Sequence, residues 1–324
     1  TNNPKKNSFI YGNWSDTPMY IKDNEGDIVR WDFHGGNLKG IIDKLGYLKK
    51  LGISIIYLSP IFEAPSNHKY DTADYKKVDP MFGDEETFKE LIDKAQKKGI
   101  SIVLDGVFSH TGADSKYFNK YGNYDEVGAC QSQSSRYISW YNFEQYPDKY
   151  KCWWDIKALP NVNELDPSYM DYIIRDRDSV IKKWTSMGVK GWRLDVADEL
   201  PMEFIKVLKK ELKETDKDAI LVGEVWEDAS NKISYGERRN YFSGKQLDSV
   251  MGYPFRQNVL SFLKRDITSK QLNDKFMEIK ENYPSEAFKS NLNLLGTHDV
   301  SRIKTELNED CDVVKLAVAI QMTF

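Results

Sequence analysis

The sequence of 324 residues is poor in cysteine and histidine, and it carries no excess of basic charge. Its three cysteines are too few for a disulfide framework and lack the spacing of zinc ligands, although Cys130 and Cys152 could form one bridge. The four histidines are scattered and form no His-X-His pair, which disfavours a metal-dependent barrel hydrolase. With 46 basic and 50 acidic residues, the net charge of −4 provides no field for binding a phosphate backbone, so nucleic acid is excluded as the expected partner.

Long apolar runs are also missing. No run approaches the roughly 20 residues that span a bilayer, so no membrane segment is expected. The start, TNNPKKNSFI, lacks the apolar core of a signal peptide. No GxGxxG or P-loop follows any predicted strand, which weighs against nucleotide binding. Aromatic residues are plentiful instead: 8 Trp, 19 Tyr and 15 Phe make up 13% of the chain. Flat apolar rings pack against sugars, although most rings in a protein belong to its core.

A repeated unit of a short apolar run, a loop and an amphipathic helix organises much of the chain. The runs are nearly continuous in hydrophobicity, as in parallel strands that are buried on both faces. The predicted strands are ISIIYLSP (53–60), ISIVLDGVF (100–108), VKGWRLDV (189–196), AILVGEVW (219–226), NLNLLGTHD (291–299) and, more weakly, LDSVMGYP (247–254). The predicted helices lie at 37–51, 84–98, 168–187, 201–214, 268–283 and 312–323. This alternation predicts an α/β fold, either a doubly wound sheet or a barrel.

One segment breaks the alternation. Residues 109–165 contain no clear βα unit and are rich in aromatic and polar side chains. A structureless loop of that length is improbable inside a compact domain, so we predict a subdomain inserted after the third strand. Its rings are expected to line a cleft.

Rare polar residues occur at the ends of the predicted strands. In parallel α/β folds, chemistry gathers at the carboxyl ends of the strands. Any one of these residues could be a cap or a structural hydrogen-bonding group, but their occurrence at four strands favours a shared site. They are Asp105 and His110, Arg193 and Asp195, Glu224, and His298 and Asp299, and His68 follows another strand.

Two of these carboxyl groups have contrasting neighbours. Arg193 and Asp195 are two positions apart in GWRLDVADE, so they share one face of a strand. The arginine would favour the ionised form of Asp195, although a structural ion pair is the alternative. Glu224 is flanked by Val225 and Trp226, whose apolar surroundings would raise its pKa and keep it protonated. A nucleophile and an acid of this kind, about 5–5.5 Å apart, are what retaining glycoside hydrolysis requires.

The motifs of this chain resemble those of the α-amylase superfamily, glycoside hydrolase family 13. DGVFSH (105–110), GWRLDVADE (191–199), GEVW (223–226) and NLLGTHD (293–299) are similar to the four family motifs and occur in the same order. LPNVNELDP (159–167) resembles a fifth motif in the form found in the neopullulanase and cyclomaltodextrinase branch, and SPIFEAPSNHKYDTADY is similar to that branch as well. The resemblance covers essentially the whole chain.

The resemblance implies roles for several charged residues. Asp195 would be the nucleophile, Glu224 the general acid/base, and Asp299 the carboxylate that stabilises the oxocarbenium-like transition state. Arg193 would orient Asp195 and keep it ionised. Asp105 would support the site structurally.

The resemblance also implies a set of substrate-binding residues. His110 and His298 would hydrogen-bond to hydroxyls of the sugar at the cleavage point. His68 and Tyr70 would line the same subsite, with the tyrosine as a stacking platform. Trp226 would shape acceptor-side subsites, with a core or surface role as the alternative.

The expected fold is an α/β (β/α)8 TIM barrel. It is expected to be incomplete at its first and eighth strands and to lack the C-terminal β-domain of the family, as in a fragment of the catalytic domain. Residues 1–108 would form the first part of the barrel, 109–165 an inserted domain B, and 166–324 the second part.

Ser109 replaces an asparagine that helps to bind a structural calcium ion in many relatives, which argues against calcium there. The oxygen-rich stretch at 15–27 lacks EF-hand spacing and is predicted to be a solvated turn.

The leading expectation is therefore a retaining glycoside hydrolase that cleaves α-1,4 glucosidic bonds, with α-1,6 bonds as an open extension. Its partner would be an α-glucan such as starch, pullulan, maltodextrin or cyclodextrin, and it would need no organic cofactor. A catalytically inactive, sugar-binding barrel is one alternative, which the presence of Asp195, Glu224 and Asp299 disfavours. A transglycosylase or isomerase that uses the same site is another alternative. Such an enzyme differs from a hydrolase only in that a sugar, and not water, takes up the glycosyl intermediate.

Overall fold

The computed structural model describes most of the chain. The described residues are 9–22, 24 and 28–324. Part of the solvated turn predicted at 15–27 lies outside them. The chain divides into two compact units. The first unit comprises residues 1–195 and 210–219, and the second comprises residues 196–209 and 220–324.

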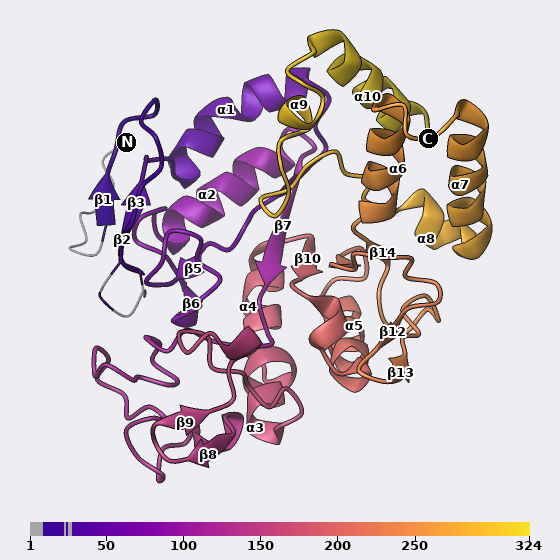
Figure 1. Cartoon of the computed structure of the whole chain (residues 1–324). Coiled ribbons are helices and arrows are strands. Elements are labelled where there is room, and N and C mark those ends of the chain that lie inside the picture. Colours follow the sequence, from indigo (N-terminus) through magenta and orange to yellow (C-terminus); the bar gives the residue numbers. More distant parts are fainter. Residues whose placement is uncertain (1–8, 23, 25–27) are drawn as a thin grey trace. The chain divides into compact units, whose positions relative to one another are not determined.

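Three parallel strands pair with one another in the first unit, and Figure 1 labels β7 and β10 among them. β7 (Ser101–Gly106) lies between β4 (Ile55–Tyr57) and β10 (Gly191–Leu194). All of β10 is buried, and so is β7 after its first residue. This is the burial expected for strands that are covered on both faces. The register places Arg193 of β10 directly opposite Asp105 of β7.

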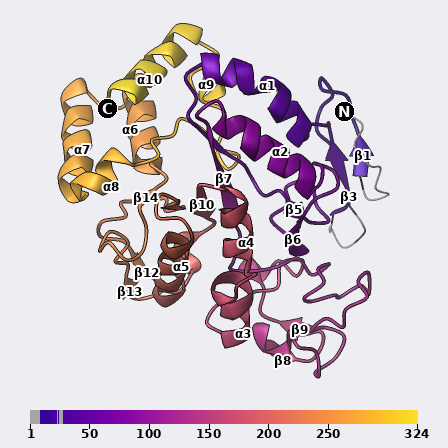
Figure 2. The same cartoon turned by 180° about the vertical axis from the view of Figure 1, so that it is seen from behind.

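Helices α1 (Leu38–Lys50) and α2 (Glu85–Gln96) lie side by side in this unit, as both Figure 1 and Figure 2 show. Each begins at a polar cap: the side chain of Asn37 accepts a hydrogen bond from a backbone N–H of α1, and the side chain of Asp84 does the same for α2. The apolar residues that predicted the two helices form their buried faces. The predictions for 37–51 and 84–98 are therefore confirmed within two residues at each end.

The helix predicted at 168–187 is interrupted. It consists of α3 (Pro167–Met170), a π-helical turn (Asp171–Arg175) and, after a break, α4 (Val180–Met187). Ser179 causes the second start, because its hydroxyl accepts a hydrogen bond from the backbone of α4 and also donates one to the carbonyl of Ile174 at 2.9 Å. A serine in that position is a helix-start signal, which the apolar periodicity of the segment concealed.

The segment 109–165 has little regular structure. Its elements are the short 3₁₀ helices Ile138–Trp140 and Trp153–Asp155 and the hairpin of β8 (Phe143–Gln145) and β9 (Lys149–Tyr150). Cys130 and Cys152 are free thiols here, so the bridge that the sequence allowed is not formed.

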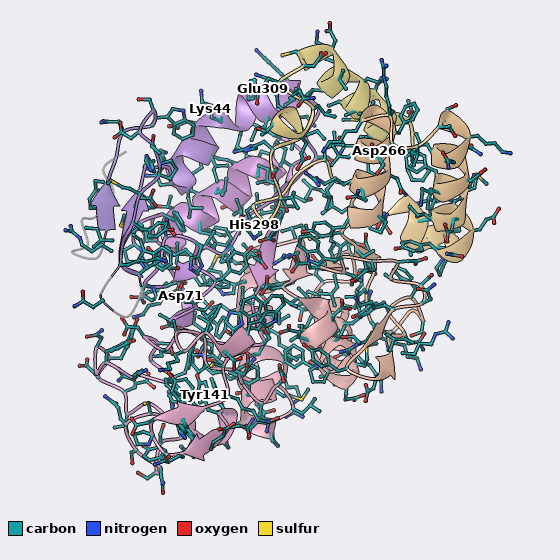
Figure 3. The ribbon with its side chains drawn as sticks, in the orientation of Figure 1. Lys44, Asp71, Tyr141, Asp266, His298 and Glu309 are labelled. Carbon is teal, nitrogen blue, oxygen red and sulfur yellow. The ribbon has the colours of Figure 1, made fainter. Side chains whose placement is uncertain are left out.

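Aromatic rings form the core of this segment. Tyr117, Trp140 and Tyr141 are buried, and the ring centroids of Tyr117 and Trp140 lie 5.3 Å apart. Figure 3 labels Tyr141. Phe118 packs edge-on against Tyr141 at 4.8 Å. The expectation that the rings line a cleft is therefore wrong for these residues, because the segment has more aromatic than aliphatic side chains and buries these rings in its core.

The second unit contains one parallel strand pair, β11 (Ile220–Gly223) with β14 (Ser249–Val250). Two apolar clusters lie within this unit, one around Val222 and Tyr253 and the other around Phe255 and Leu260. Its helices α6 (Tyr253–Leu263), α8 (Ser285–Lys289) and α9 (Ile303–Glu306) were not predicted, and neither was the 3₁₀ helix Ala197–Glu199. The predicted helices α7 (Ser269–Asn282) and α10 (Cys311–Thr323) also lie in this unit. The predicted helix α5 (Met202–Thr215) has its first residues in this unit and its last residues in the first unit.

The strand predicted at 291–299 does not form. A single parallel bridge joins Leu292 to Met251, and the segment then leaves the strand direction. The carbonyl of Asn293 accepts a hydrogen bond from the side-chain amide of Gln321 at 2.7 Å instead of from a neighbouring strand. A side-chain partner thus satisfies a backbone group that a sheet would otherwise have paired.

The remaining elements are short. They are β1 (Phe9–Tyr11), β2 (Ile21–Lys22), β3 (Ile28–Phe33), β5 (Phe62–Glu63), β6 (Asp74–Val78), the 3₁₀ helix Ala197–Glu199, β12 (Ile233–Ser234) and β13 (Glu237–Arg238). None of the helices in the described part of the chain has the length and apolar character needed to cross a membrane.

Candidate active site

Arg193 joins two carboxylates in the first unit. Its Nη1 donates to Asp195 Oδ1 at 2.7 Å and to the two carboxylate oxygens of Asp105 at 2.9 and 3.1 Å. All three side chains are buried. Asp195 directly follows the last residue of β10, and the strand register brings Asp105 to the same guanidinium. The ion pair predicted from GWRLDVADE is therefore present, and it is part of a larger network.

Two tyrosines complete the surroundings of Asp105. The hydroxyls of Tyr57 and Tyr70 both donate to Asp105 Oδ2, the second at 2.9 Å. Burial, together with the charge of Asp105, raises the pKa of both phenols far above the ordinary value. Both hydroxyls therefore stay protonated and act as donors. The network fixes Tyr70, a predicted substrate residue, to the same carboxylate that holds Arg193.

The predicted sugar-binding residues of the first unit gather around Tyr70. The rings of His68 and Tyr70 are stacked at 6.1 Å, and the Tyr70 N–H donates to His68 Nδ1 at 3.1 Å. His110 Nε2 lies 3.1 Å from the Tyr70 carbonyl. The structure thus brings His68, Tyr70 and His110 together, as their common assignment to one subsite requires.

Lys69 holds the loop between these residues. Its side chain is buried, with Nζ 2.8 Å from Asp79 Oδ2 and 2.9 Å from the carbonyl of Ala64. Its φ angle is +66°, which is uncommon for a residue other than glycine. The buried ion pair stabilises this backbone conformation and so positions His68 and Tyr70 on either side. Sequence reasoning missed Lys69, since a lysine in a loop is normally solvated.

His110 is enclosed by protein groups. Only 2% of its surface is exposed, and burial lowers its pKa to about 4. A carbonyl can only accept, so the neutral ring carries its proton on Nε2 and donates to Tyr70, while Nδ1 accepts from the Ser109 hydroxyl at 3.0 Å. A hydrogen bond from His110 to a sugar would therefore require one of these partners to be exchanged.

His110 is expected to make the stability of the protein depend on pH. Its pKa is lower in the folded chain than in the unfolded chain, so the unfolded state takes up the proton first as the pH falls. The contribution is complete above about pH 6.5 and is lost as the pH falls to about 4, to a total of about 3 kcal/mol. Urea unfolding of the wild type and His110→Gln at pH 7 and pH 4 measures this loss. Equal losses in the two proteins would show that His110 does not titrate in this range.

Glu224 directly follows β11 in the second unit, and hydrogen-bond donors surround its buried carboxyl group. Oε2 accepts from the backbone N–H of Val196 at 2.8 Å. Oε1 lies 3.3 Å from Trp226 Nε1 and 3.5 Å from the Tyr253 hydroxyl. The surroundings of the Glu224 carboxyl group are therefore not only apolar, as the sequence had suggested, because the indole of Trp226 also offers a polar N–H.

Tyr253 was not identified from the sequence. Its buried ring stacks on Trp226 with the centroids 4.0 Å apart, and its hydroxyl also lies 3.4 Å from Thr297 Oγ1. Trp226 itself is 46% exposed, so one side of the indole is open to solvent. The only signal in the sequence is a tyrosine next to a proline in the first turn of α6, which is too common to indicate a site.

Val196 has a strained backbone. Its φ and ψ are +40° and +59°, a left-handed conformation that is a genuine outlier for a β-branched residue. The turn directs the Val196 N–H at Glu224 Oε2 and lets the Ala197 N–H bond to the Glu224 carbonyl at 3.1 Å. Such strain costs about 1–3 kcal/mol and persists where the surroundings enforce it.

His298 and Asp299 lie in the loop before α9, and Figure 3 labels His298. His298 Nε2 is 3.1 Å from Asp299 Oδ2, and both side chains are more than a third exposed. The Asp299 N–H donates to Thr297 Oγ1 at 3.2 Å. The second unit thus carries Glu224 and Trp226 as one pair and His298 and Asp299 as another.

The polar groups of Ser109 are used in contacts within the protein. Ser109 uses its hydroxyl on His110 and its carbonyl on the Asn161 side chain. A calcium site needs six to eight oxygen ligands, and carboxylates usually supply several of them. Within residues 9–22, 24 and 28–324, no group of three or more His, Cys, Asp or Glu side chains is arranged to hold a metal ion.

Comparison with known proteins identifies the family. Residues 7–324 match the model for the alpha amylase catalytic domain. The chain is 40% identical over 352 residues to an amylopullulanase of Thermoanaerobacterium saccharolyticum, covering 95% of this chain and 26% of that protein. It is 36% identical over 300 residues to neopullulanase 2 of Thermoactinomyces vulgaris, covering 90% of this chain and 48% of that protein. The ligand-free cyclic alpha-maltosyl-(1→6)-maltose hydrolase of Arthrobacter globiformis superposes with a TM-score of 0.84 at 28% identity, covering 98% of this chain and 66% of that one.

The chain spans a quarter to a half of the length of these two curated relatives, at 26% and 48%. Amylopullulanase and neopullulanase are names of glycoside hydrolases, and the second belongs to the branch that the motifs SPIFEAPSNHKYDTADY and LPNVNELDP indicate. The match to the catalytic-domain model extends over nearly the whole chain. The chain therefore belongs to the alpha-amylase catalytic-domain family, glycoside hydrolase family 13.

Proposed function

We propose that this chain is the catalytic region of a retaining glycoside hydrolase that cleaves α-1,4 glucosidic bonds in starch, pullulan, maltodextrin or cyclodextrin. The observation that carries the proposal is the setting of two carboxyl groups at strand ends. Asp195 is held by a buried arginine after β10, and Glu224 is held by hydrogen-bond donors after β11. The name of the maltosyl-(1→6)-maltose hydrolase motivates an extension to α-1,6 bonds.

The proposed reaction is a double displacement. Asp195 attacks the anomeric carbon while Glu224 gives its proton to the departing glycosidic oxygen, which leaves a glycosyl ester on Asp195. Glu224, now ionised, takes a proton from water as the water oxygen attacks the anomeric carbon and releases Asp195. Asp299 stabilises the positive charge that develops on the sugar in both steps. Arg193 keeps Asp195 ionised and oriented.

The other predicted residues would bind the substrate. Tyr70 would be the stacking platform of the cleaved sugar, with hydrogen bonds from histidines and a further ring on the acceptor side. The proposed set is Tyr70, His68, His110, His298 and Trp226. The stack of His68 on Tyr70 and the open side of Trp226 support these roles.

We further propose a (β/α)8 barrel as the complete fold, with domain B at 109–165 inserted after the third strand and the barrel parts at 1–108 and 166–324. The alternation of parallel strands with helices within each unit supports this proposal. The separate aromatic core at 109–165 supports the inserted domain.

Product analysis tests the function. We expect the protein to release short maltooligosaccharides from maltotriose, β-cyclodextrin or pullulan, and to release them first as α-anomers, because two displacements restore the starting configuration. Thin-layer chromatography identifies the products, and proton NMR during the first minutes identifies the anomer. Initial β-anomers would contradict the double displacement. Binding of starch without any product would favour the inactive, sugar-binding alternative.

A further inference from the structure

The loop that begins with Glu224 carries a tight hairpin. β12 and β13 pair through Ile233 with Arg238 and Ser234 with Glu237, so two residues, Tyr235 and Gly236, form the connection. Their φ angles are +52° and +79°. Positive φ at both residues of a two-residue connection defines a type I′ turn, which strongly prefers asparagine, aspartate or glycine.

Tyr235 is a poor residue for this turn. A bulky aromatic side chain at positive φ is strained, and strain of this kind is often found at functional sites. Burial does not offset it, because 75% of Tyr235 is exposed. The turn conformation therefore does not explain a tyrosine at this position: the hydroxyl interacts with Glu199, and most of the ring is left exposed.

The hairpin is firmly attached to the segment that follows Asp195 in the chain. The Ser234 hydroxyl donates to the Asp198 carbonyl at 2.9 Å, and Lys232 Nζ lies 3.2 Å from Asp198 Oδ2. The Tyr241 hydroxyl donates to Asp198 Oδ1 at 2.5 Å. Asp198 thus fixes both ends of the hairpin, so the ring is presented on a rigid support.

The two ends of the Tyr235 side chain have different surroundings. Partial burial and the carboxylate of Glu199, which faces the hydroxyl, raise the pKa of Tyr235. The hydroxyl is therefore held at one edge while the ring surface remains open. Two residues earlier, Ile233 is 68% exposed, and Arg238 pairs with it across the hairpin and is exposed too.

We propose that the hairpin surface, made of Ile233, Tyr235 and Arg238, binds a glucose unit of the α-glucan other than the one being cleaved. This inference rests on the proposed function. The C–H faces of glucose pack on an aromatic ring, and a guanidinium with five donors can bond to the hydroxyls at the rim of the sugar. The hairpin lies in the loop that begins at Glu224. A glucose unit bound there would be an additional unit of the same substrate, so the hairpin surface would add affinity only for chains long enough to reach it.

The substitution Tyr235→Asn separates binding from folding. Asparagine suits a type I′ turn, which offsets the loss of the hydroxyl's interaction with Glu199, so the thermal unfolding midpoint is expected to change little. The ratio of kcat/KM for maltoheptaose to kcat/KM for maltotriose is expected to fall roughly tenfold, because the sugar loses its stacking partner. Tyr235→Phe keeps the ring and is expected to restore most of the ratio. Tyr47→Ala removes another exposed ring, 62% exposed, from α1 and is the matched control, with the wild-type ratio expected.

Calorimetry with maltoheptaose measures the same site without turnover when both proteins carry Glu224→Gln. We expect Tyr235→Asn to raise the Kd roughly tenfold. A chain that cleaves no glucan but shows this loss of affinity would contradict the proposed function and support the hairpin site. A chain that cleaves glucans and keeps both its ratio and its Kd in Tyr235→Asn would overturn the hairpin site alone.

Discussion

Replacing Glu224 by glutamine is expected to lower kcat for unactivated α-glucans by roughly 10²–10⁴-fold, the usual contribution of a general acid. Glutamine keeps the size of the side chain, and its amide oxygen can still accept from the Val196 N–H. It has no proton to give to the departing oxygen. Reducing-sugar release from maltotriose measures kcat, and calorimetry measures binding, which we expect to be largely unchanged.

Two comparisons test the proposed acid role of Glu224. A maltosyl substrate with a good leaving group needs little protonation, so its first step should be affected much less than the cleavage of maltotriose. Glu203→Gln changes an exposed glutamate on α5 that pairs with Lys206, and it is expected to keep wild-type activity. Wild-type kcat on maltotriose in Glu224→Gln would remove Glu224 from the mechanism.

Replacing Arg193 by methionine is expected to lower the free energy of unfolding by about 3–5 kcal/mol, the usual cost of leaving buried charges without their partner. Arg193 is the cation between Asp105 and Asp195, and all three are buried. Methionine fills much of the space but leaves two carboxylates facing each other. Urea unfolding measures the loss, and activity should fall as well because Asp195 loses its orientation.

A second substitution tests the cause of this loss. Adding Asp105→Asn to Arg193→Met removes one of the two negative charges, so the double variant is expected to recover part of the stability. Arg175→Met breaks an exposed ion pair with Asp171 and should cost about 1 kcal/mol or less. If Arg193→Met cost no more than this control, the network around Arg193 would not contribute to stability as described.

The elements that could be predicted are those whose pattern is local. β7 and β10 are continuous apolar runs, and α1 and α2 have an apolar stripe that starts at a capping residue. The strand prediction for 291–299 was wrong because its asparagines hydrogen-bond to side-chain and loop partners that a single sequence does not reveal. The prediction of a single helix at 168–187 was wrong because the apolar periodicity of the segment concealed the helix cap at Ser179.

The candidate site shows the same division. The spacing of Arg193 and Asp195 predicted a shared strand face and an ion pair, and the ion pair is present. The bond from Arg193 to Asp105 depends on the register between β7 and β10, which is set by distant residues. Tyr57 and Tyr253 could not be found either, because each acts through a hydroxyl that only the folded chain brings to a carboxylate.

The most direct test of the proposed mechanism is to identify the residue that becomes glycosylated. Fluoride leaves without a proton, so Glu224→Gln should react with α-maltosyl fluoride but should hydrolyse the resulting ester slowly, because it lacks the base. Mass spectrometry of the digested protein then locates the sugar. We predict a maltosyl group on Asp195. A maltosyl group on any other residue, or release of β-maltose with no adduct, would contradict the account.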